Sequence, residues 1–397
     1  MRVRRLAPAL MSAILALGAC SSSISGTDAA GTSSTSTTVD QSDAAPSITT
    51  VFRAGEGGYA SFRIPAVVAA KDGSLLAFAE GRTSSAADDG NVDLVLKRSS
   101  DGGSTWSALQ VVAEDGANFV GNPSPVVDHA TGRIVVLATH KDGADSEVDI
   151  VLGQGHDTSR VWLLTSDDAG TRWSTPRDIT TEVKQPDWRW YTVGPGHAIQ
   201  LTTGPHPGRL VAPANHFDAQ KGAGANVLVS DDGGTTWTIG AVDTPGPGTD
   251  APDESTSAEL PDGTIVFSSR NQNQDAPWHR LRTTSADAGA TYAAPFAEQV
   301  GLVVPVVQGS LLWAGGEGGR LLFSAPSSPT DRIDLKVRTS TDAGLTWSEG
   351  TMIASGPSAY SDLVELPAGR VGILYEVGAA DPNERIDLTI IGAKRLN

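Results

Sequence analysis

The segment Ser99–Trp106, SSDGGSTW, contains the pattern that decides the fold, because the same arrangement returns four more times along the chain. The pattern is Ser-x-Asp-x-Gly-x-x-aromatic. Its later copies are SDDAGTRW at 166–173, SDDGGTTW at 230–237, SADAGATY at 285–292 and STDAGLTW at 340–347. Aspartate can accept hydrogen bonds from the backbone of its own turn, and glycine adopts a positive φ without steric cost. Each copy therefore predicts a tight turn between two strands, with its aromatic ring packed against neighbouring structure.

A glycine turn precedes each of these copies, and a sixth glycine turn follows the last one. The six glycines are Gly73, Gly132, Gly208, Gly263, Gly319 and Gly369. A β-rich run follows each of them, such as SLLAFAE after Gly73 and RVGILYE after Gly369. Six such hairpins predict an all-β fold, a six-bladed β-propeller, in which each blade runs strand, glycine turn, two strands, aspartate turn and strand. The sixth hairpin has no aspartate turn, so we expect the strand-like ITTVFRAG at 48–55 to pair with the last blade and close the ring.

The N-terminus has the features of an export signal. Arginines at positions 2, 4 and 5 precede an apolar stretch from Leu6 to Leu17, and Leu-Gly-Ala-Cys follows at 17–20. We expect a lipoprotein signal peptide over residues 1–19 and a lipid anchor on Cys20, which places the protein on the extracellular face of the cell membrane, or else secreted. The alternative is an incidental cysteine near an ordinary signal cleavage site. Residues 20–47, rich in serine and threonine, predict a flexible linker, and residues 48–397 form the predicted propeller.

The composition argues against several classes of protein. The net charge is −17, and −20 without residues 1–19, which contain three arginines and no acidic residue. A chain this acidic is a poor partner for nucleic acid. Cys20 is the only cysteine, which excludes an internal disulfide and a cysteine-rich metal site. We expect a monomer with no cofactor and no metal; an acidic pair could bind a structural calcium ion, but nothing in the sequence requires it.

Charged and polar residues recur at the ends of the predicted inner strands, opposite the turns. Counting about ten residues back and about eight forward from the glycine turns, with Arg332 from the fifth blade, gives Arg63, Arg82, Asn122, His140, His197, Asn215, Glu254, Arg270, Arg332, Tyr360 and Glu376. Inner strands line the axis of a propeller, so we expect these groups to converge on one pocket. The alternative is that strand ends are simply polar. Three arginines, Arg63, Arg270 and Arg332, can hold one carboxylate, which indicates an acidic sugar or a similar small acid as ligand.

The tetrapeptide FRIP at 62–65 and the five aspartate turns resemble the motifs of bacterial sialidases. The similarity extends over residues 48–397 and includes WYTVGPGHAIQL at 190–201 and SAYSDLVEL at 358–366. The resemblance implies an exo-α-sialidase, a glycoside hydrolase that removes terminal α-linked sialic acids from sialylated glycoconjugates. It also implies retention of configuration through a tyrosyl-enzyme intermediate, an exception to the usual pair of carboxylates.

The same resemblance implies a role for each residue that matches the family's motifs. The matching residues are Arg63, Arg82, Arg270, Arg332 and Glu376 for substrate binding, and Asp88, Tyr360 and Glu254 for catalysis. Three of the arginines correspond to a carboxylate clamp, Arg82 to a further substrate contact, and Glu376 to the residue that orients Arg63. Asp88 corresponds to the general acid and base, with Asp89 as a competing candidate. Tyr360 corresponds to the nucleophile and Glu254 to the carboxylate that activates it.

A tyrosine nucleophile fits this substrate, because sialic acid carries a carboxylate on its anomeric carbon that repels an anionic attacking group. A neutral phenol that loses its proton only during attack avoids that repulsion.

Each of these residues also has a non-catalytic alternative: Tyr360 as a core tyrosine, Glu376 as a surface charge, and Asp88 as an ordinary loop residue. His140, His197 and Asn215 are expected to line the pocket, or else to be satisfied polar residues at strand ends. Three functional alternatives also remain: a non-catalytic sialic-acid-binding propeller, a trans-sialidase or an enzyme that releases an anhydro product, and a structural assembly factor.

Overall fold

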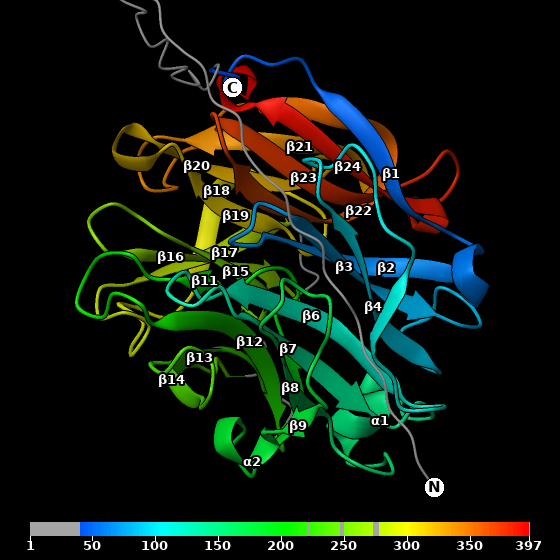
Figure 1. Ribbon diagram of the computed structural model, residues 1–397. Coiled ribbons are helices and arrows are strands. Elements are labelled where there is room, and N and C mark those ends of the chain that lie inside the picture. The colour runs from blue at the N-terminus through cyan, green and yellow to red at the C-terminus, as the bar shows by residue number, and fades with distance from the viewer. Residues whose placement is uncertain (1–39, 221, 247–249, 273–277, 397) are drawn as a thin grey trace, which may run out of the picture. The chain divides into compact units, whose positions relative to one another are not determined.

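The prediction of an all-β fold is confirmed. The computed structural model describes residues 40–220, 222–246, 250–272 and 278–396, and these residues belong to one compact unit (Figure 1). The predicted signal peptide, Cys20 and the linker up to residue 39 lie outside the described residues. Among the described segments, no helix combines the length and apolarity that a membrane span requires. The helices α1 (Glu147–Leu152) and α2 (Thr180–Val183) are both short.

The strands form four hydrogen-bonded sheets, whose members follow the chain order closely. The first sheet contains β2 (Ser61–Ala69), β3 (Leu75–Arg82), β4 (Val92–Ser99), β5 (Gln110–Ala113), β6 (Phe119–Val127), β7 (Ile134–Lys141), β8 (Arg160–Ser166) and β9 (Arg177–Asp178). The second contains β10 (Trp188–Val193), β11 (Ile199–Gln200), β12 (Leu210–Asp218), β13 (Ala223–Ser230) and β14 (Thr238–Asp243). The third contains β15 (Pro252–Glu259), β16 (Ile265–Asn271), β17 (His279–Ser285) and β18 (Ala297–Val303).

The fourth sheet joins the two ends of the domain. It contains β19 (Ser310–Ala314), β20 (Arg320–Pro326), β21 (Ile333–Ser340), β22 (Thr351–Leu366), β23 (Arg370–Val377), β24 (Arg385–Gly392) and β1 (Ser47–Arg53). The expected pairing of the N-terminal strand with the last strands is confirmed, because β1 pairs antiparallel with β24 (Figure 1). The packed part begins within the predicted linker, since Gln41 and Ala44 bond through their backbones to Ala368 and Gly392.

The aspartate turns share one hydrogen-bond pattern, which explains why the sequence repeats. In the first copy, the Ser99 hydroxyl accepts from the Gly103 N–H at 2.8 Å and donates to Asp101 at 2.8 Å. Asp101 also accepts from the N–H of Thr105 at 2.9 Å and from its hydroxyl at 2.6 Å, and these bonds lower the pKa of Asp101 to about 2. The last two residues of the Ser-x-Asp-x-Gly core have positive φ in all five copies, at 102–103, 169–170, 233–234, 288–289 and 343–344.

The glycines of the first turn provide a direct test of this packing. Gly103 has φ +89°, and a Cβ there would lie 2.7 Å from Leu388 Cδ2 and 2.8 Å from Ile390 Cδ1, both on β24. Gly102 has φ +70°, and its Cβ would meet nothing within 4 Å. We expect Gly103→Ala to lower the free energy of unfolding by about 2–5 kcal/mol, because it adds overpacking to left-handed backbone strain. Gly102→Ala should cost about 1–2 kcal/mol, since only the strain applies. Equal losses for the two variants in denaturant titrations would contradict this packing.

The glycine turns follow the prediction with one exception. Gly73, Gly132, Gly208, Gly263 and Gly369 all have positive φ, whereas Gly319 has φ −76°. In the fifth turn the positive φ values belong to Gly315 and Gly316, which begin a short 3-10 turn. The chain offers four neighbouring glycines there, so the turn forms earlier than the motif predicted.

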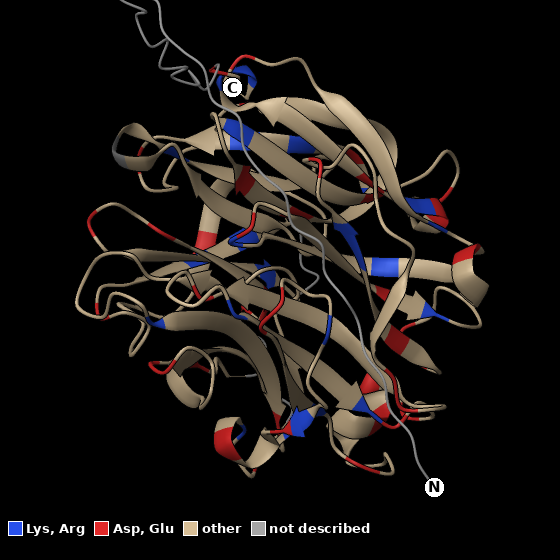
Figure 2. Cartoon of the chain, in the orientation of Figure 1, with Lys and Arg blue, Asp and Glu red and all other residues tan. Residues whose placement is uncertain are grey.

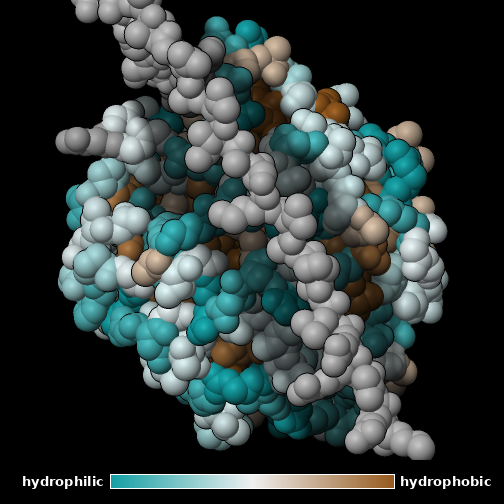
Figure 3. Space-filling model, viewed as in Figure 1, coloured by the Kyte–Doolittle hydropathy of each residue, from teal (hydrophilic) through white to brown (hydrophobic). Residues whose placement is uncertain are grey.

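Apolar clusters form the core, some within one sheet and others between two sheets. One cluster combines Phe52 of β1, Leu75 of β3 and Leu388 of β24, which are each at most 1% exposed. The face seen in Figure 3 is mostly hydrophilic, with small apolar areas. Figure 2 shows acidic residues on many loops and strand ends, as the net charge of −17 requires.

Candidate active site

Seven of the eight predicted site residues line one cavity of about 280 Å³. They are Arg63, Arg82, Asp88, Glu254, Arg270, Arg332 and Tyr360. The eighth, Glu376, is fully buried behind it and accepts hydrogen bonds from the N–H groups of Ile64 at 2.9 Å and Tyr360 at 3.2 Å. The structure therefore brings together residues that lie up to 313 positions apart in the sequence.

Bulges in the inner strands turn several of these side chains into the cavity. The strand register shifts between Arg63 and Ala66 on β2, between Pro252 and Ser255 on β15, and between Ser358 and Ser361 on β22. A bulge bends the strand and re-aims its side chains. Consecutive residues can then face the same side, as Asp253 and Glu254 do here. A regular strand would send one of the two away from the cavity.

Tyr360 and Glu254, which both line the cavity, are joined by a short hydrogen bond. The Tyr360 hydroxyl donates to Glu254 Oε1 at 2.6 Å. Arg270 Nη1 donates to Glu254 Oε2 at 2.8 Å and to the Tyr360 hydroxyl oxygen at 3.2 Å. Burial and the Glu254 charge raise the pKa of Tyr360 well above its usual value, despite the nearby arginines. The phenol is therefore neutral in the free protein, and it is bonded to a carboxylate that can take its proton.

Three arginines surround the tyrosine. The guanidinium carbons of Arg63 and Arg332 lie 5.2 and 5.6 Å from the centre of the Tyr360 ring, and Arg270 contacts its hydroxyl. Glu376 forms an ion pair with Arg63 at 3.3 Å and orients it. Arg332 comes from the loop before β21, where its Nη2 donates to the Val306 carbonyl at 3.0 Å. Arg270 Nε is buried without a hydrogen-bond partner among the described residues.

Asp88 lies on the loop between β3 and β4, at the edge of the cavity. Its Oδ1 accepts from Arg82 at 2.8 Å and from Arg63 at 3.1 Å, while its side chain remains 82% exposed. Desolvation raises the pKa of Asp88, but the charges of Arg82 and Arg63 outweigh it, so the pKa lies below its usual value. Arg82 is also held by Glu80, at 2.9 Å from its Nε. Asp89, the competing candidate, also lines the cavity, but no ion pair joins it to these arginines.

Three predicted pocket residues lie elsewhere. His140 pairs with Asp115 at 2.8 Å and stacks on Trp162, and His197 pairs with Asp362 at 2.7 Å. Asn215 is buried and donates to Thr192, which itself lines the cavity. The prediction that they line the pocket was wrong, because none of the three is among the residues that line the cavity and each bonds to another side chain instead.

Part of the cavity wall was not predicted from the sequence. Lys141, Glu147, Trp190, Asp253 and Gln272 all line it. Burial raises the pKa of Asp253 to about 7, and it lowers the pKa of Lys141. Position alone could have indicated Asp253, as the neighbour of Glu254 at a strand start. The others carry no repeated signal.

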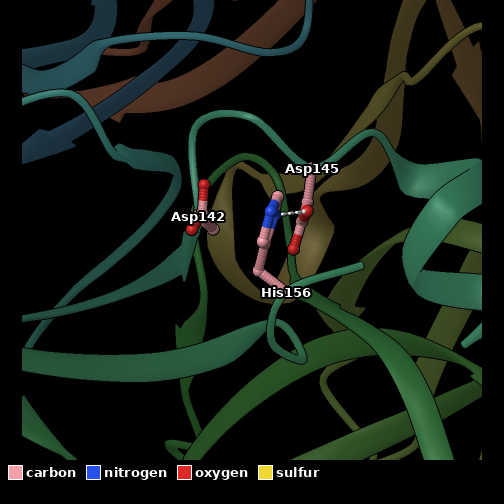
Figure 4. A group of neighbouring side chains, drawn as sticks. All are labelled: Asp142, Asp145 and His156. Carbon is pink, nitrogen blue, oxygen red and sulfur yellow. Dashed lines mark hydrogen bonds and ion pairs between the residues drawn. The ribbon is translucent and has the colours of Figure 1, made fainter. Parts of the chain in front are cut away.

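One group of described side chains has the composition of a metal site. Asp142, Asp145 and His156 place their ligand atoms within 4.8 Å of one another, and their side chains face each other across two loops (Figure 4). Asp145 already accepts from His156 Nδ1 at 2.7 Å and from the Asp157 N–H at 3.1 Å. These hydrogen bonds link the loops on either side of α1, which explains why the three side chains lie together. We assign no metal to the cluster.

Comparison with known proteins shows that this chain has relatives of similar sequence and structure. The model of the BNR repeat-like domain matches residues 73–373. A sialidase from Micromonospora viridifaciens is 32% identical over 359 residues, which cover 85% of this chain and 53% of that protein. The chain thus spans about half the length of that relative.

Two further matches cover more of the known protein. An exo-alpha-sialidase from Aspergillus fumigatus is 32% identical over 347 residues, which cover 80% of this chain and 79% of that protein. The solved structure of a Hadza microbial sialidase superposes with a TM-score of 0.76 at 28% identity, over 87% of this chain and 68% of that one.

Proposed function

The chain belongs to the sialidase family with the BNR repeat-like domain, and we propose that it is an exo-α-sialidase that releases terminal α-linked sialic acids from glycoconjugates. The observation that carries the proposal is the Tyr360–Glu254 contact at 2.6 Å, inside a cavity where three arginines converge. Three cations suit a ligand carboxylate, and a neutral tyrosine bonded to a base suits attack beside that carboxylate.

We propose that the four sheets make up a six-bladed β-propeller. Strand β22 pairs with β21 through Thr351–Pro357 and with β23 through Ser358–Leu366, so it serves two blades. A single parallel pair, Val92 with Phe119, joins the first two blades into one sheet. A second cavity, of about 470 Å³, supports this arrangement, since residues of β2, β6, β11, β15, β19 and β22 line it, one strand from each proposed blade.

The mechanism that we propose begins with binding of the substrate carboxylate to Arg63, Arg270 and Arg332. The Tyr360 oxygen attacks the anomeric carbon while Glu254 takes its proton, and Asp88 protonates the departing glycosidic oxygen. A covalent sialyl–tyrosine forms as the glycosidic bond breaks. Asp88 then removes a proton from water, which attacks the anomeric carbon, and Glu254 returns the proton to Tyr360. Two inversions give net retention.

The position of Asp88 predicts proton uptake when substrate binds. In the free protein its pKa is below the usual value because of Arg82 and Arg63, so it is ionised at neutral pH. When a ligand carboxylate pairs with Arg63, the ionised form of Asp88 loses the stabilisation that Arg63 provides. The pKa of Asp88 should therefore rise. We expect calorimetric titration with an unsaturated sialic acid analogue, at about pH 6, to give enthalpies that depend on the buffer's ionisation enthalpy. Asp88→Asn should abolish the dependence. Equal enthalpies for the wild type in all buffers would contradict this account of Asp88.

Hydrolysis of a fluorogenic α-sialoside and of a sialylated glycoprotein by purified 40–397 protein tests the function. We expect free sialic acid as the product in both cases. Tight binding of sialic acid without turnover would identify a non-catalytic binding protein. Transfer of sialic acid to an added galactoside in preference to water, or release of an anhydro sugar, would identify the alternative enzymes.

We also propose that the mature protein is a monomer, anchored through a lipid on Cys20 at the outer face of the cell membrane. The signal-like residues 1–19 and the cysteine at position 20 support the lipid anchor. Fractionation of cells that express the full chain should place it in the membrane fraction, and Cys20→Ser should release it. Membrane association that Cys20→Ser leaves unchanged would rule out the anchor.

A further inference from the structure

The buried carboxylate of Asp362 joins three other segments of the chain. Asp362 on β22 is completely buried, and its side chain accepts four hydrogen bonds. Their donors are the Val67 N–H at 2.8 Å, the His197 N–H at 3.1 Å, His197 Nδ1 at 2.7 Å and the Ser310 hydroxyl at 2.8 Å. Burying a carboxylate is costly unless it is paired and fully hydrogen-bonded, and Asp362 meets both conditions.

These four bonds connect parts of the chain that carry the active site. Val67 lies on β2, four residues after Arg63. Ser310 begins β19, and His197 lies between β10 and β11. Asp362 itself follows Tyr360 by two residues. One side chain therefore ties the strand of the tyrosine to the strand of a carboxylate-binding arginine.

The backbone around Tyr360 needs such support, because regular strand pairing is interrupted there. The register between β22 and β23 shifts between Ser358 and Ser361, so Tyr360 lies in a bulge. Side chains provide the hydrogen bonds that strand pairing would otherwise make there. The Tyr360 N–H donates to Glu376 at 3.2 Å, and the Ser361 backbone exchanges two hydrogen bonds of 3.1 Å with the Gln308 side-chain amide. Asp362 is the anchor on the far side of the bulge.

The partner of Asp362 strengthens the anchor, because Nδ1 of His197 lies 2.7 Å from the Asp362 carboxylate. Burial disfavours the charged imidazole of His197, but the Asp362 charge and hydrogen bond outweigh it, so the pKa of His197 is raised. A buried carboxylate that loses a hydrogen-bond donor is left with an uncompensated charge, so this contact is costly to break from the His197 side. The Asp362–His197 pair therefore has one strongly preferred geometry.

We infer that Asp362 is a positioning residue: its hydrogen bonds to Val67, His197 and Ser310 hold Tyr360 in register with the arginines that bind the substrate carboxylate. The inference rests on the proposed function and extends it to a residue outside the cavity. A shift of about 1 Å between a nucleophile and its target costs roughly 100-fold in rate. Each arginine of the clamp has a contact of its own, Arg63 with Glu376, Arg270 with Glu254 and Arg332 with the Val306 carbonyl, so substrate affinity should depend less on Asp362.

Asp362→Asn tests the inference, because it keeps the volume of the side chain and replaces one acceptor with a donor that faces other donors. We expect kcat to fall about 100-fold while KM and the inhibition constant of an unsaturated sialic acid analogue change by about threefold or less.

Asp128→Asn is the matched control. Asp128 is 5% exposed and accepts hydrogen bonds from Thr131 and Gln200, but it lies at the glycine turn away from the cavity. It should lose stability with little change in kcat. If folded Asp362→Asn retained kcat within about threefold of the wild type, or lost no more than the control, the inference would be overturned.

Two milder variants keep the test open if Asp362→Asn does not fold. Ser310→Ala and His197→Gln each remove part of the anchor, and we expect roughly 5- to 20-fold lower kcat with KM nearly unchanged. Wild-type kcat in both would overturn the inference.

A crystal structure of a folded variant separates this inference from the proposed function. Displacement of the Tyr360 hydroxyl from Glu254 beyond the present 2.6 Å supports positioning even if the wild type has no sialidase activity. An unmoved tyrosine would refute the inference even if the wild type is an active sialidase.

Discussion

Tyr360→Phe is expected to lower kcat on an α-sialoside by about 1000-fold or more, because it removes the nucleophile and keeps the ring. The ring packs with Ile64, Val307 and Ala359 in a small buried cluster, and phenylalanine preserves that packing. Glu254 keeps its bond to Arg270 at 2.8 Å in the variant. Stability should therefore change little, and the loss should appear in kcat.

The control for this variant is Tyr375→Phe, which removes another buried tyrosine hydroxyl. Tyr375 is 2% exposed and bonds to Thr389 at 3.0 Å, away from the cavity. It should retain wild-type kcat. A Tyr360→Phe enzyme with kcat within about tenfold of the wild type would show that the hydroxyl is not the attacking group.

Arg332→Lys has the second largest expected effect, and it appears in substrate binding. Arg332 donates one hydrogen bond, to the Val306 carbonyl, and forms no ion pair among the described residues, so its replacement leaves no buried carboxylate unpaired. Lysine lacks the planar fork that grips a carboxylate. We expect the loss of this contact to cost about 2–5 kcal/mol of binding free energy. This corresponds to a decrease in kcat/KM of roughly 30-fold to several thousand-fold.

Inhibition by two ligands isolates the cause of that loss. The affinity of an unsaturated sialic acid analogue should fall with kcat/KM, whereas the affinity of its neutral methyl ester, already weak, should change much less. Equal losses for the acid and the ester would show that Arg332 does not bind the carboxylate.

The strands and their order could be predicted from the sequence because the turns repeat. Each aspartate turn carries its own hydrogen-bond partners within five residues, as Ser99, Asp101 and Thr105 show, so its geometry is local. The pairing of β1 with β24 followed from the missing sixth aspartate turn. The fifth glycine turn was misplaced because four glycines compete there.

Much of the site could also be predicted, since strand position and family motifs both selected the residues that surround Tyr360. The parts of the site that could not be predicted depend on contacts between segments that lie far apart in the sequence. The bond from Val67 to Asp362 spans 295 positions and has no local pattern. His197 was expected at the same strand position as Arg63, but it lies between β10 and β11 and bonds to Asp362 instead of lining the cavity. Bulges decide such directions, and strand periodicity alone does not place them.

The most direct test of the central claim is to trap the covalent intermediate. A fluorinated sialic acid with a good leaving group slows release of the sugar from the enzyme, and mass spectrometry of the digested protein then locates the adduct. The account predicts one sialyl adduct per chain, on the peptide that contains Tyr360, and none in Tyr360→Phe. Turnover of sialosides with no adduct, or an adduct on another residue, would contradict the proposal that Tyr360 is the nucleophile of a retaining sialidase.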